Sequence, residues 1–286
     1  MSAASRWGTP VSLIRLEGSD TRRFLHGQSS QAIELAKPGD CLPTCLISPT
    51  ARMRGLALVC VDDTGADLIV IAGDGEGIRA GLDRVLFPAD NVRLGAAEPA
   101  TLWQWQGDAQ AEDSVQLRRG VDLGSGPHAA VVLQRSGEAL QPWLSDLPEW
   151  SDEQVEANRL RHGLPAEPGE LNDDTNPFEL GLANWVSLNK GCYVGQETLA
   201  KLATYDGVKQ QLRYWESSSA LEPGTTLSSA GGERAGVVTS SQGCRGLALI
   251  RRSQLEASTL QAGGSELTIS TPLAFIAPPI GAGGQG

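Results

Sequence analysis

One cysteine lies in a run of residues whose types favour thiol chemistry. The run is Lys-Gly-Cys-Tyr-Val-Gly-Gln-Glu at residues 190–197, and it places Cys192 two positions after Lys190. A helix is expected to begin near Gly195, so a nearby cation and a helix N-terminus would both favour the thiolate, which is a nucleophile and a metal ligand. The residue types leave open the alternative of a buried, inert cysteine.

The other residues of this run have narrower expected roles. Gly191 and Gly195 allow backbone conformations or close approaches that other residues do not. Tyr193 and Gln196 are expected to pack or to hydrogen-bond around the turn. The candidate active residues are Cys192, as the functional thiol, with Lys190, Tyr193, Gln196 and Glu197.

The five cysteines are odd in number and irregularly spaced, unlike a secreted disulfide framework, so all are expected to be reduced thiols. They are Cys41, Cys45, Cys60, Cys192 and Cys244. Cys41 and Cys45 lie within an expected strand, and no histidine forms a ligand pair with either, so no resident metal or iron–sulfur cluster is expected. A cluster that contacts Cys192 would take its remaining ligands from a partner.

Charge and hydrophobicity exclude some partners. The net charge of −11 argues against nucleic acid as the main partner, because binding to phosphates draws on clustered Lys and Arg. The first ten residues lack the apolar core of a secretory signal, and no apolar run is long enough to span a membrane. We therefore expect a cytoplasmic protein with no membrane partner.

The first half of the chain alternates between expected strands and short helices. These are a strand over 11–16, a helix after the N-cap candidate Asp20, apolar strands within 45–61 and 67–72, and a helix over 77–86. Residues 62–65 are typical of a hairpin turn. Short strands around a loop at 124–127 are expected after the segment 96–99, as a subdomain of their own.

The second half begins with the clearest helix and ends in short strands. Ser151 to Gln154 fits a capping box, and Gly163 supplies a left-handed stop. The long loop 164–177 is rich in Pro, Asn and Asp, as functional loops often are. From about residue 207, brief apolar segments separated by Gly and Ser predict a small antiparallel β-barrel, followed by a flexible tail at 281–286.

The run at 190–197 resembles the signature of the YgfZ family of folate-binding proteins, which is related to the glycine-cleavage T-protein, GcvT. Further stretches occur in the family's order: Leu16-Glu-Gly-Ser-Asp, Phe24-Leu-His-Gly-Gln, Arg159-Leu-Arg-His-Gly, Asn176-Pro-Phe-Glu-Leu-Gly and Ala235-Gly-Val-Val-Thr-Ser-Ser. The resemblance covers most of the chain and is weakest over 96–150.

The resemblance implies an α+β fold in which three domains surround a central folate cavity and the last is a β-barrel. Residues 1–205 would form the folate-binding region from two interleaved subdomains, with 97–150 in the second. Residues 206–286 would form the barrel domain with its flexible tail. It also implies a monomer that binds tetrahydrofolate or a one-carbon derivative and supports assembly or repair of iron–sulfur enzymes, with iron–sulfur client or assembly proteins as partners. No catalysed reaction is firmly attached to the family.

The resemblance also assigns folate-binding residues. Glu179 would accept hydrogen bonds from pterin nitrogens, and Arg159 would form a bidentate pair with a folate carboxylate; a purely structural Arg–Glu contact is the alternative. Gly191, Gly195 and Lys201 complete the predicted cofactor site. Lys201 stands where many members have Arg, and 206–209 is less basic than in the family, which weakens the expected grip on an anionic ligand.

Two other functions compete with this interpretation. In an aminomethyltransferase of the T-protein type, an aspartate lies in the segment corresponding to residues 49–57. Here no Asp or Glu occurs from 41 to 61, so the required acid is missing unless a distant carboxylate folds in. A monothiol redox protein acting through Cys192 would need an external thiol, because the chain has no C-x-x-C motif.

Overall fold

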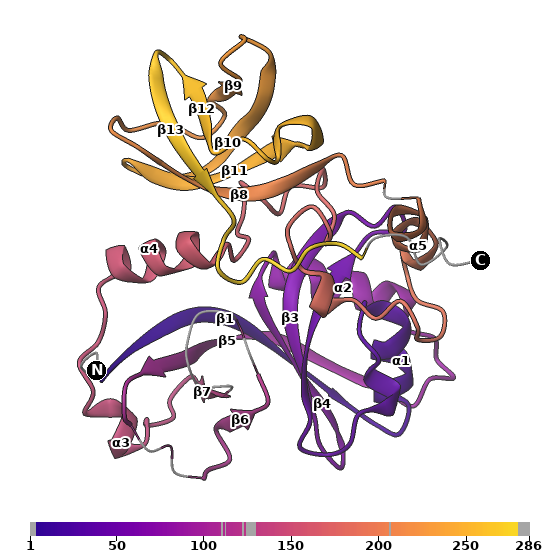
Figure 1. Ribbon diagram of the computed structural model, residues 1–286. Helices are drawn as coiled ribbons and strands as arrows, with labels where there is room; N and C mark the ends of the chain where they lie inside the picture. The colour runs from indigo at the N-terminus through magenta and orange to yellow at the C-terminus, as the bar shows by residue number, and fades with distance from the viewer. Residues whose placement is uncertain are drawn as a thin grey trace. The chain divides into compact units, whose positions relative to one another are not determined.

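The computed structural model describes residues 4–109, 111, 113–121, 123, 130–205 and 207–279. They divide into two compact units, each built from separate segments (Figure 1). The first unit takes its residues from 1–48, 54–152 and 185–194, and the second from 49–53, 153–184 and 195–286. The domain boundary between residues 205 and 206 stays a prediction. The predicted loop at 124–127 and the tail at 281–286 lie outside the described residues.

The first unit is built on a seven-stranded sheet with the order β2-β3-β4-β1-β5-β7-β6. Its strands are β1 (Ser5–Glu17), β2 (Cys41–Ile47), β3 (Met53–Val61), β4 (Gly65–Ala72), β5 (Arg93–Gln106), β6 (Leu117–Arg119) and β7 (Ala130–Arg135). Its helices are α1 (Thr21–Gln28), α2 (Gly75–Val85), α3 (Pro142–Ser145) and the 3₁₀ turns η1 (Ile33–Leu35) and η2 (Ala183–Trp185), the last of which runs across a unit boundary.

The strands expected after the segment 96–99 belong to the same sheet as the first strand of the chain. β5 pairs with β1 from Ser5 to Glu17. It runs through Pro99, at the end of the segment 96–99, where the sequence pattern suggests the start of a separate subdomain. β7 pairs only with residues 100–103 of β5, so the missing N–H of Pro99 lies beyond this ladder. These strands therefore extend the first sheet.

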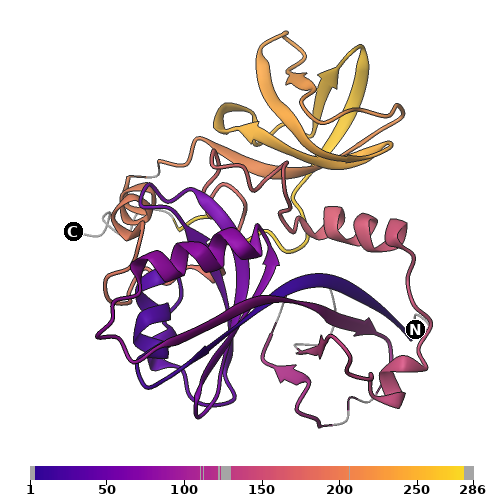
Figure 2. The ribbon, with the colours of Figure 1, turned by 180° about the vertical axis from the view of Figure 1, so that it is seen from behind.

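Helices α1 and α2 cover one face of this sheet (Figure 2). Alternate residues of the strands form the core beneath them, including Ile14, Leu16, Val59 and Leu68, all fully buried. Asp20 does precede α1, but its carboxylate accepts the N–H of Asn91 at 3.0 Å and does not cap the helix. The predicted helix, its N-cap position at Asp20 and the hairpin at 62–65 are confirmed, although Asp20 makes no side-chain hydrogen bond to the helix.

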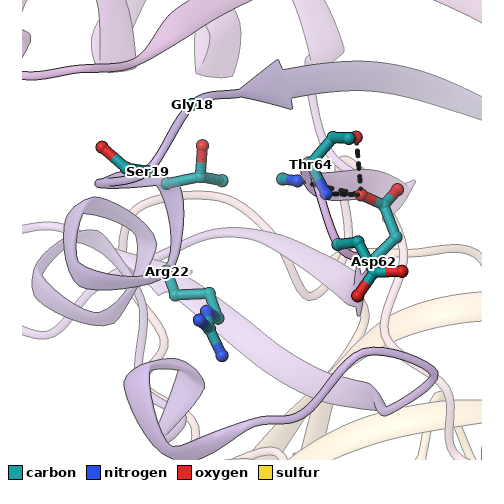
Figure 3. Close-up of a pocket in the computed structure, with 8 residues that line it drawn as sticks. Gly18, Ser19, Arg22, Asp62 and Thr64 are labelled. Atoms are coloured by element: carbon teal, nitrogen blue, oxygen red, sulfur yellow. Dashed lines mark hydrogen bonds between the residues drawn. The ribbon is translucent and has the colours of Figure 1, made fainter.

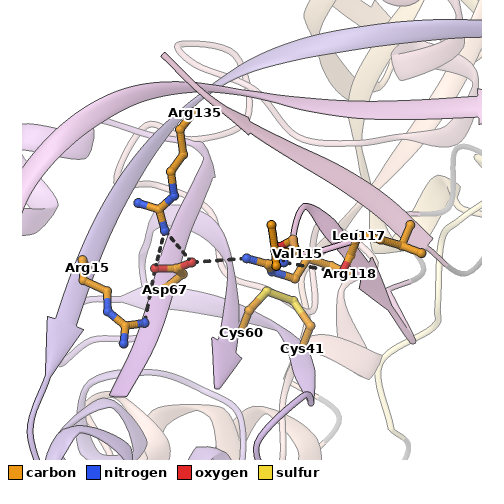
Figure 4. The surroundings of a disulfide bond; sticks show 8 residues. All are labelled: Arg15, Cys41, Cys60, Asp67, Val115, Leu117, Arg118 and Arg135. Carbon is orange, nitrogen blue, oxygen red and sulfur yellow. Dashed lines mark hydrogen bonds and ion pairs between the residues drawn. A yellow bond between two sulfur atoms is a disulfide. The ribbon is translucent and has the colours of Figure 1, made fainter. Parts of the chain in front are cut away.

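The opposite face of the sheet carries a disulfide beside a group of ionic side chains (Figure 4). Cys41 on β2 is bonded to Cys60 on the neighbouring β3, so the expectation that all five cysteines are reduced is wrong. The physical reason is the pairing of the two strands, which brings together residues 19 positions apart. Beside it, buried Asp67 accepts hydrogen bonds from Arg15, Arg118 and Arg135 at 3.0–3.4 Å. 

The second unit contains two helices and a closed six-stranded barrel with the order β10-β11-β8-β13-β12-β9. Its helices are α4 (Asp152–His162), α5 (Gln196–Thr204) and the 3₁₀ turn η3 (Arg252–Gln254). Its strands are β8 (Gln210–Ser217), β9 (Thr226–Ser228), β10 (Arg234–Gln242), β11 (Arg245–Arg251), β12 (Thr259–Ala262) and β13 (Ser265–Ser270). The predicted C-terminal barrel is confirmed; β9 and β12 are too short to give a clear sequence pattern.

Local signals define the helices of this unit. α4 ends at Gly163, which has the left-handed φ of 75° that the sequence predicts. Apolar side chains such as Trp215 and Leu267 fill the barrel. Among the described residues, no helix is long and apolar enough to cross a membrane.

Candidate functional site

Lys190 fastens the start of the 190–197 run to the end of α1. Its Nζ donates hydrogen bonds to the main-chain oxygens of His26 (2.5 Å), Ser29 (2.7 Å) and Gln31 (2.7 Å). The last carbonyls of a helix lack intrahelical partners and carry partial negative charge, so an ammonium is well matched to them. The predicted cation is therefore present, and its hydrogen bonds are directed at the backbone.

Two effects act on the charge of Lys190. Burial lowers the pKa of its ammonium to about 7. The three carbonyls act in the opposite sense, because only the charged form supplies three N–H donors. The ring of Tyr193 lies 4.4 Å from Nζ and adds a cation–π contact, which also favours the ammonium.

Tyr193 and Cys45 form the buried side of the site. Burial raises the pKa of the Cys45 thiol to about 12 and also raises the pKa of Tyr193. Ser30 Oγ accepts the N–H of Cys45 at 2.8 Å and donates to the carbonyl of Trp185 at 2.7 Å. Ser30 thus connects β2 to the segment that leads into the run, a role the sequence analysis missed.

Cys192 is exposed and is a free thiol. The alternative of a buried cysteine therefore does not apply at this position, and the buried free cysteine is Cys45. The segment thus has buried residues that hold it in place and an exposed sulfur atom. Lys190 and Tyr193 are buried, whereas Gly191 and Cys192 are exposed.

His26 is a second residue that the sequence analysis did not single out. Its Nδ1 accepts the backbone N–H of Glu34 at 3.2 Å, and its Nε2 lies 3.5 Å from the position that a Cβ atom would have on Gly191. Burial and the charge of Lys190 lower the pKa of His26, while Glu34 opposes them. The available signal was its place in Phe24-Leu-His-Gly-Gln, one of the stretches that resemble the family.

The second half of the run belongs to the other unit and begins α5. Gly195 occupies the N-cap position with a left-handed φ of 81°, as a glycine permits, and Gln196 is the first helical residue. Glu197 and Lys201 form an exposed ion pair at 2.8 Å, one helical turn apart. This hydrogen bond lowers the pKa of Glu197 and raises that of Lys201.

Arg159 on α4 is already paired. Its Nε and Nη2 donate to the two carboxylate oxygens of Glu156, each at 2.7 Å, and its Nη1 donates to the carbonyl of Leu164 at 2.7 Å. Nη1 also lies 3.5 Å from the carboxylate of buried Glu170. This geometry matches the structural Arg–Glu alternative, and a folate carboxylate would have to replace Glu156.

Glu179 is a buried carboxylate in the same unit as Arg159. One of its oxygens accepts the N–H of Asn176 at 3.1 Å, and Gln210 also hydrogen-bonds to it. Burial raises the pKa of Glu179, and the positive charge of Arg52 partly opposes this effect. A carboxylate from a distant part of the chain therefore folds near the segment that lacks its own acid.

The predicted site residues fall into two groups. The first unit holds Lys190, Gly191, Cys192 and Tyr193, together with His26, Ser30 and Cys45; the second holds Arg159, Glu179, Gly195, Gln196, Glu197 and Lys201. Their functional roles stay predictions.

A cavity of about 390 Å³ lies elsewhere in the first unit (Figure 3). It is lined by Gly18, Ser19, Thr21, Arg22, Asp62, Asp63, Thr64 and Gly65, between the start of α1 and the β3–β4 hairpin. Asp62 is held by Arg15 at 2.5 Å, which lowers the pKa of that carboxyl. No residue of the predicted site lines this cavity.

A family model and a solved structure show which fold the chain has. Residues 209–275 match the family model of the CAF17 C-terminal beta-barrel domain. The glycine cleavage system aminomethyltransferase T of Bartonella henselae has a similar structure, with a TM-score of 0.78 and 17% identity over 98% of this chain and 88% of that one. The chain therefore has a GcvT-like fold that ends in a β-barrel similar to the CAF17 C-terminal domain.

Several named proteins have sequences similar to that of this chain. A chloroplastic protein of Arabidopsis thaliana, provisionally named a transferase, is 31% identical over 80% of this chain. The chain spans about 60% of that relative's length. The mouse mitochondrial iron–sulfur cluster assembly factor IBA57 is 25% identical over 85% of this chain and 76% of its own length. Human IBA57 is 34% identical over 42% of this chain and 35% of its own. Because these relatives are named for organelles, the cytoplasmic location stays a prediction.

Proposed function

We propose that this protein is an accessory factor for the assembly or repair of iron–sulfur enzymes, and that it acts through the thiol of Cys192. The observation that carries the proposal is the exposed free Cys192 on a segment that Lys190 fastens to α1. The relatives named as iron–sulfur cluster assembly factors support this class of role.

In this proposal the cluster is cargo and its other ligands come from a partner. Among the residues that the structure describes, no group of three or more His, Cys, Asp or Glu side chains could hold a metal ion. One thiolate is far short of the four that a cluster normally takes from its scaffold. Client or assembly proteins are thus the proposed partners, and Cys192 supplies a single sulfur to a shared site.

Tetrahydrofolate, or a one-carbon derivative, is the proposed cofactor. Glu179 has the chemistry to accept pterin N–H groups, and the Arg159 guanidinium can pair with a carboxylate if Glu156 gives way. Lys201, Gly191 and Gly195 are the remaining proposed contacts. Bound folate would supply a one-carbon carrier, while the chain's own residues bind and orient it.

Complementation tests the role and the thiol together. Cells lacking their own YgfZ-type protein should regain iron–sulfur enzyme activity with the wild-type chain and not with Cys192→Ala. Cys244→Ala is a matched control, because Cys244 is also an exposed free thiol. Full rescue by Cys192→Ala would contradict the proposed thiol, and failure of the wild type would contradict the role.

Calorimetry tests the folate proposal separately. Tetrahydrofolate should bind the wild type, and Arg159→Ala should weaken binding about tenfold or more, since a charge-assisted bidentate pair is lost. Arg161→Ala removes the same charge from an exposed position of α4 and should bind normally. Absence of wild-type binding would remove folate from the proposal.

A folate-dependent aminomethyltransferase is the second candidate. The observation in its favour is Glu179, a buried carboxylate with a raised pKa that lies near Arg52 in the segment 49–57. A raised pKa suits a general acid. Glycine-cleavage assays with the partner proteins should show no methylene transfer under the main proposal. Turnover that Glu179→Gln abolishes would establish the second candidate instead.

A further inference from the structure

The imidazole of His26 is held in one orientation beside Gly191, the residue that precedes the exposed Cys192. It is only 8% exposed. Its Nδ1 accepts the N–H of Glu34, so the neutral ring carries its proton on Nε2. The main-chain carbonyl of His26 accepts a hydrogen bond from Lys190. His26 is therefore held through its ring by Glu34 and is connected through its main chain to the 190–197 run.

The Nε2–H donor has no hydrogen-bond acceptor in the part of the chain that the structure describes. It lies beside exposed Gly191, 3.5 Å from the position of a Cβ there. A side chain at 191 would contact Nε2, whereas glycine leaves this side of the ring uncovered. The next residue is Cys192, whose exposed side chain is free to change its rotamer.

We propose that His26 is a positioning residue for Cys192, donating its Nε2–H to the thiolate once this forms. The proposal rests on the proposed function in taking Cys192 as the working thiol. The donor is a neutral imidazole, because burial and the adjacent Lys190 both lower the pKa of His26, with Glu34 as the opposing charge. The contribution is therefore a directed hydrogen bond that favours the thiolate over the thiol.

The pH profile of Cys192 alkylation by iodoacetamide tests this inference. The background is Cys244→Ser, because Cys244 is exposed, while buried Cys45, with its pKa raised to about 12, should not compete. His26→Asn keeps an acceptor for the Glu34 N–H but loses the donor at Nε2. It should move the midpoint of the rate profile upward by about one pH unit, the size expected for one hydrogen bond to an anion.

His26→Gln is the matched variant, because its amide nitrogen reaches about as far as Nε2 and restores a donor. Its midpoint should return close to that of the parent. An unchanged midpoint in His26→Asn overturns the inference. Should that variant unfold, the ¹⁵N shifts of His26 in the parent protein decide: the Nε2–H tautomer supports the inference, and the Nδ1–H tautomer overturns it.

This test is separate from that of the proposed function. Alkylation needs neither folate nor a client enzyme. If Cys192→Ala rescues cells fully while His26→Asn still shifts the profile, the proposed function fails and the hydrogen bond stands. If Cys192→Ala fails to rescue while the profile does not move, the function stands and the role of His26 is lost.

Discussion

The two halves of the 190–197 run lie in opposite environments, as Lys190 at its start and Lys201 just beyond its end show. Lys190, in the first half, is buried and bound to three main-chain oxygens. Lys201, one turn beyond Glu197 on α5, is exposed and paired only across the helix surface in the contacts described. The comparison shows that the position of a lysine in the sequence does not by itself reveal its structural role. A buried ammonium organises backbone, whereas an exposed one remains available to a ligand.

Loss of the buried ammonium should have the largest effect. Lys190→Met keeps the aliphatic length but removes the donor to the carbonyls of His26, Ser29 and Gln31, of which Gln31 still accepts the N–H of Ile33, so we expect about 3 kcal/mol of lost stability. The measurement is urea unfolding followed by circular dichroism. A loss below about 1 kcal/mol would show that water replaces the ammonium readily and that the run is not fastened by it.

The glycines of the two halves offer a second contrast. Gly195 has a φ of 81°, so Gly195→Ala should cost about 1–2 kcal/mol through left-handed strain. Gly191 does not have a positive φ, and a Cβ there meets only His26 Nε2 at 3.5 Å, an ordinary contact. Gly191→Ala should therefore change stability by less than about 0.5 kcal/mol. Equal losses in the same unfolding experiment would contradict this difference.

These contrasts also show what the sequence can and cannot specify. The helix start after Gly195 and the stop at Gly163 are local, because one glycine conformation decides each. The barrel follows from short alternating segments. The Arg159–Glu156 pair is only three residues apart on a helix, so it was open to prediction from spacing alone.

Long-range pairings were beyond the sequence pattern. Lys190 binds carbonyls about 160 positions earlier in the chain, and no local periodicity encodes such a partner. The disulfide between Cys41 and Cys60 depends on how β2 and β3 lie beside each other, which cysteine counting does not reveal. The position of Glu179 near Arg52 likewise depends on the folding of distant segments into one unit. The sequence thus predicts elements and candidate residues better than their partners.

The exposed lysine should give the smallest change in stability and the clearest separation of roles. Lys201→Met removes an ion pair in which both side chains are largely exposed, so the unfolding midpoint should not move measurably. Because Lys201 is a proposed folate contact, its loss should weaken tetrahydrofolate binding several-fold in calorimetry, and more at low salt than at high salt. Glu197→Gln is the control: it breaks the same pair but leaves the cation free, so folate should bind at least as well as to the wild type. If both variants bind equally, Lys201 does not belong to the folate site and is a surface charge of α5.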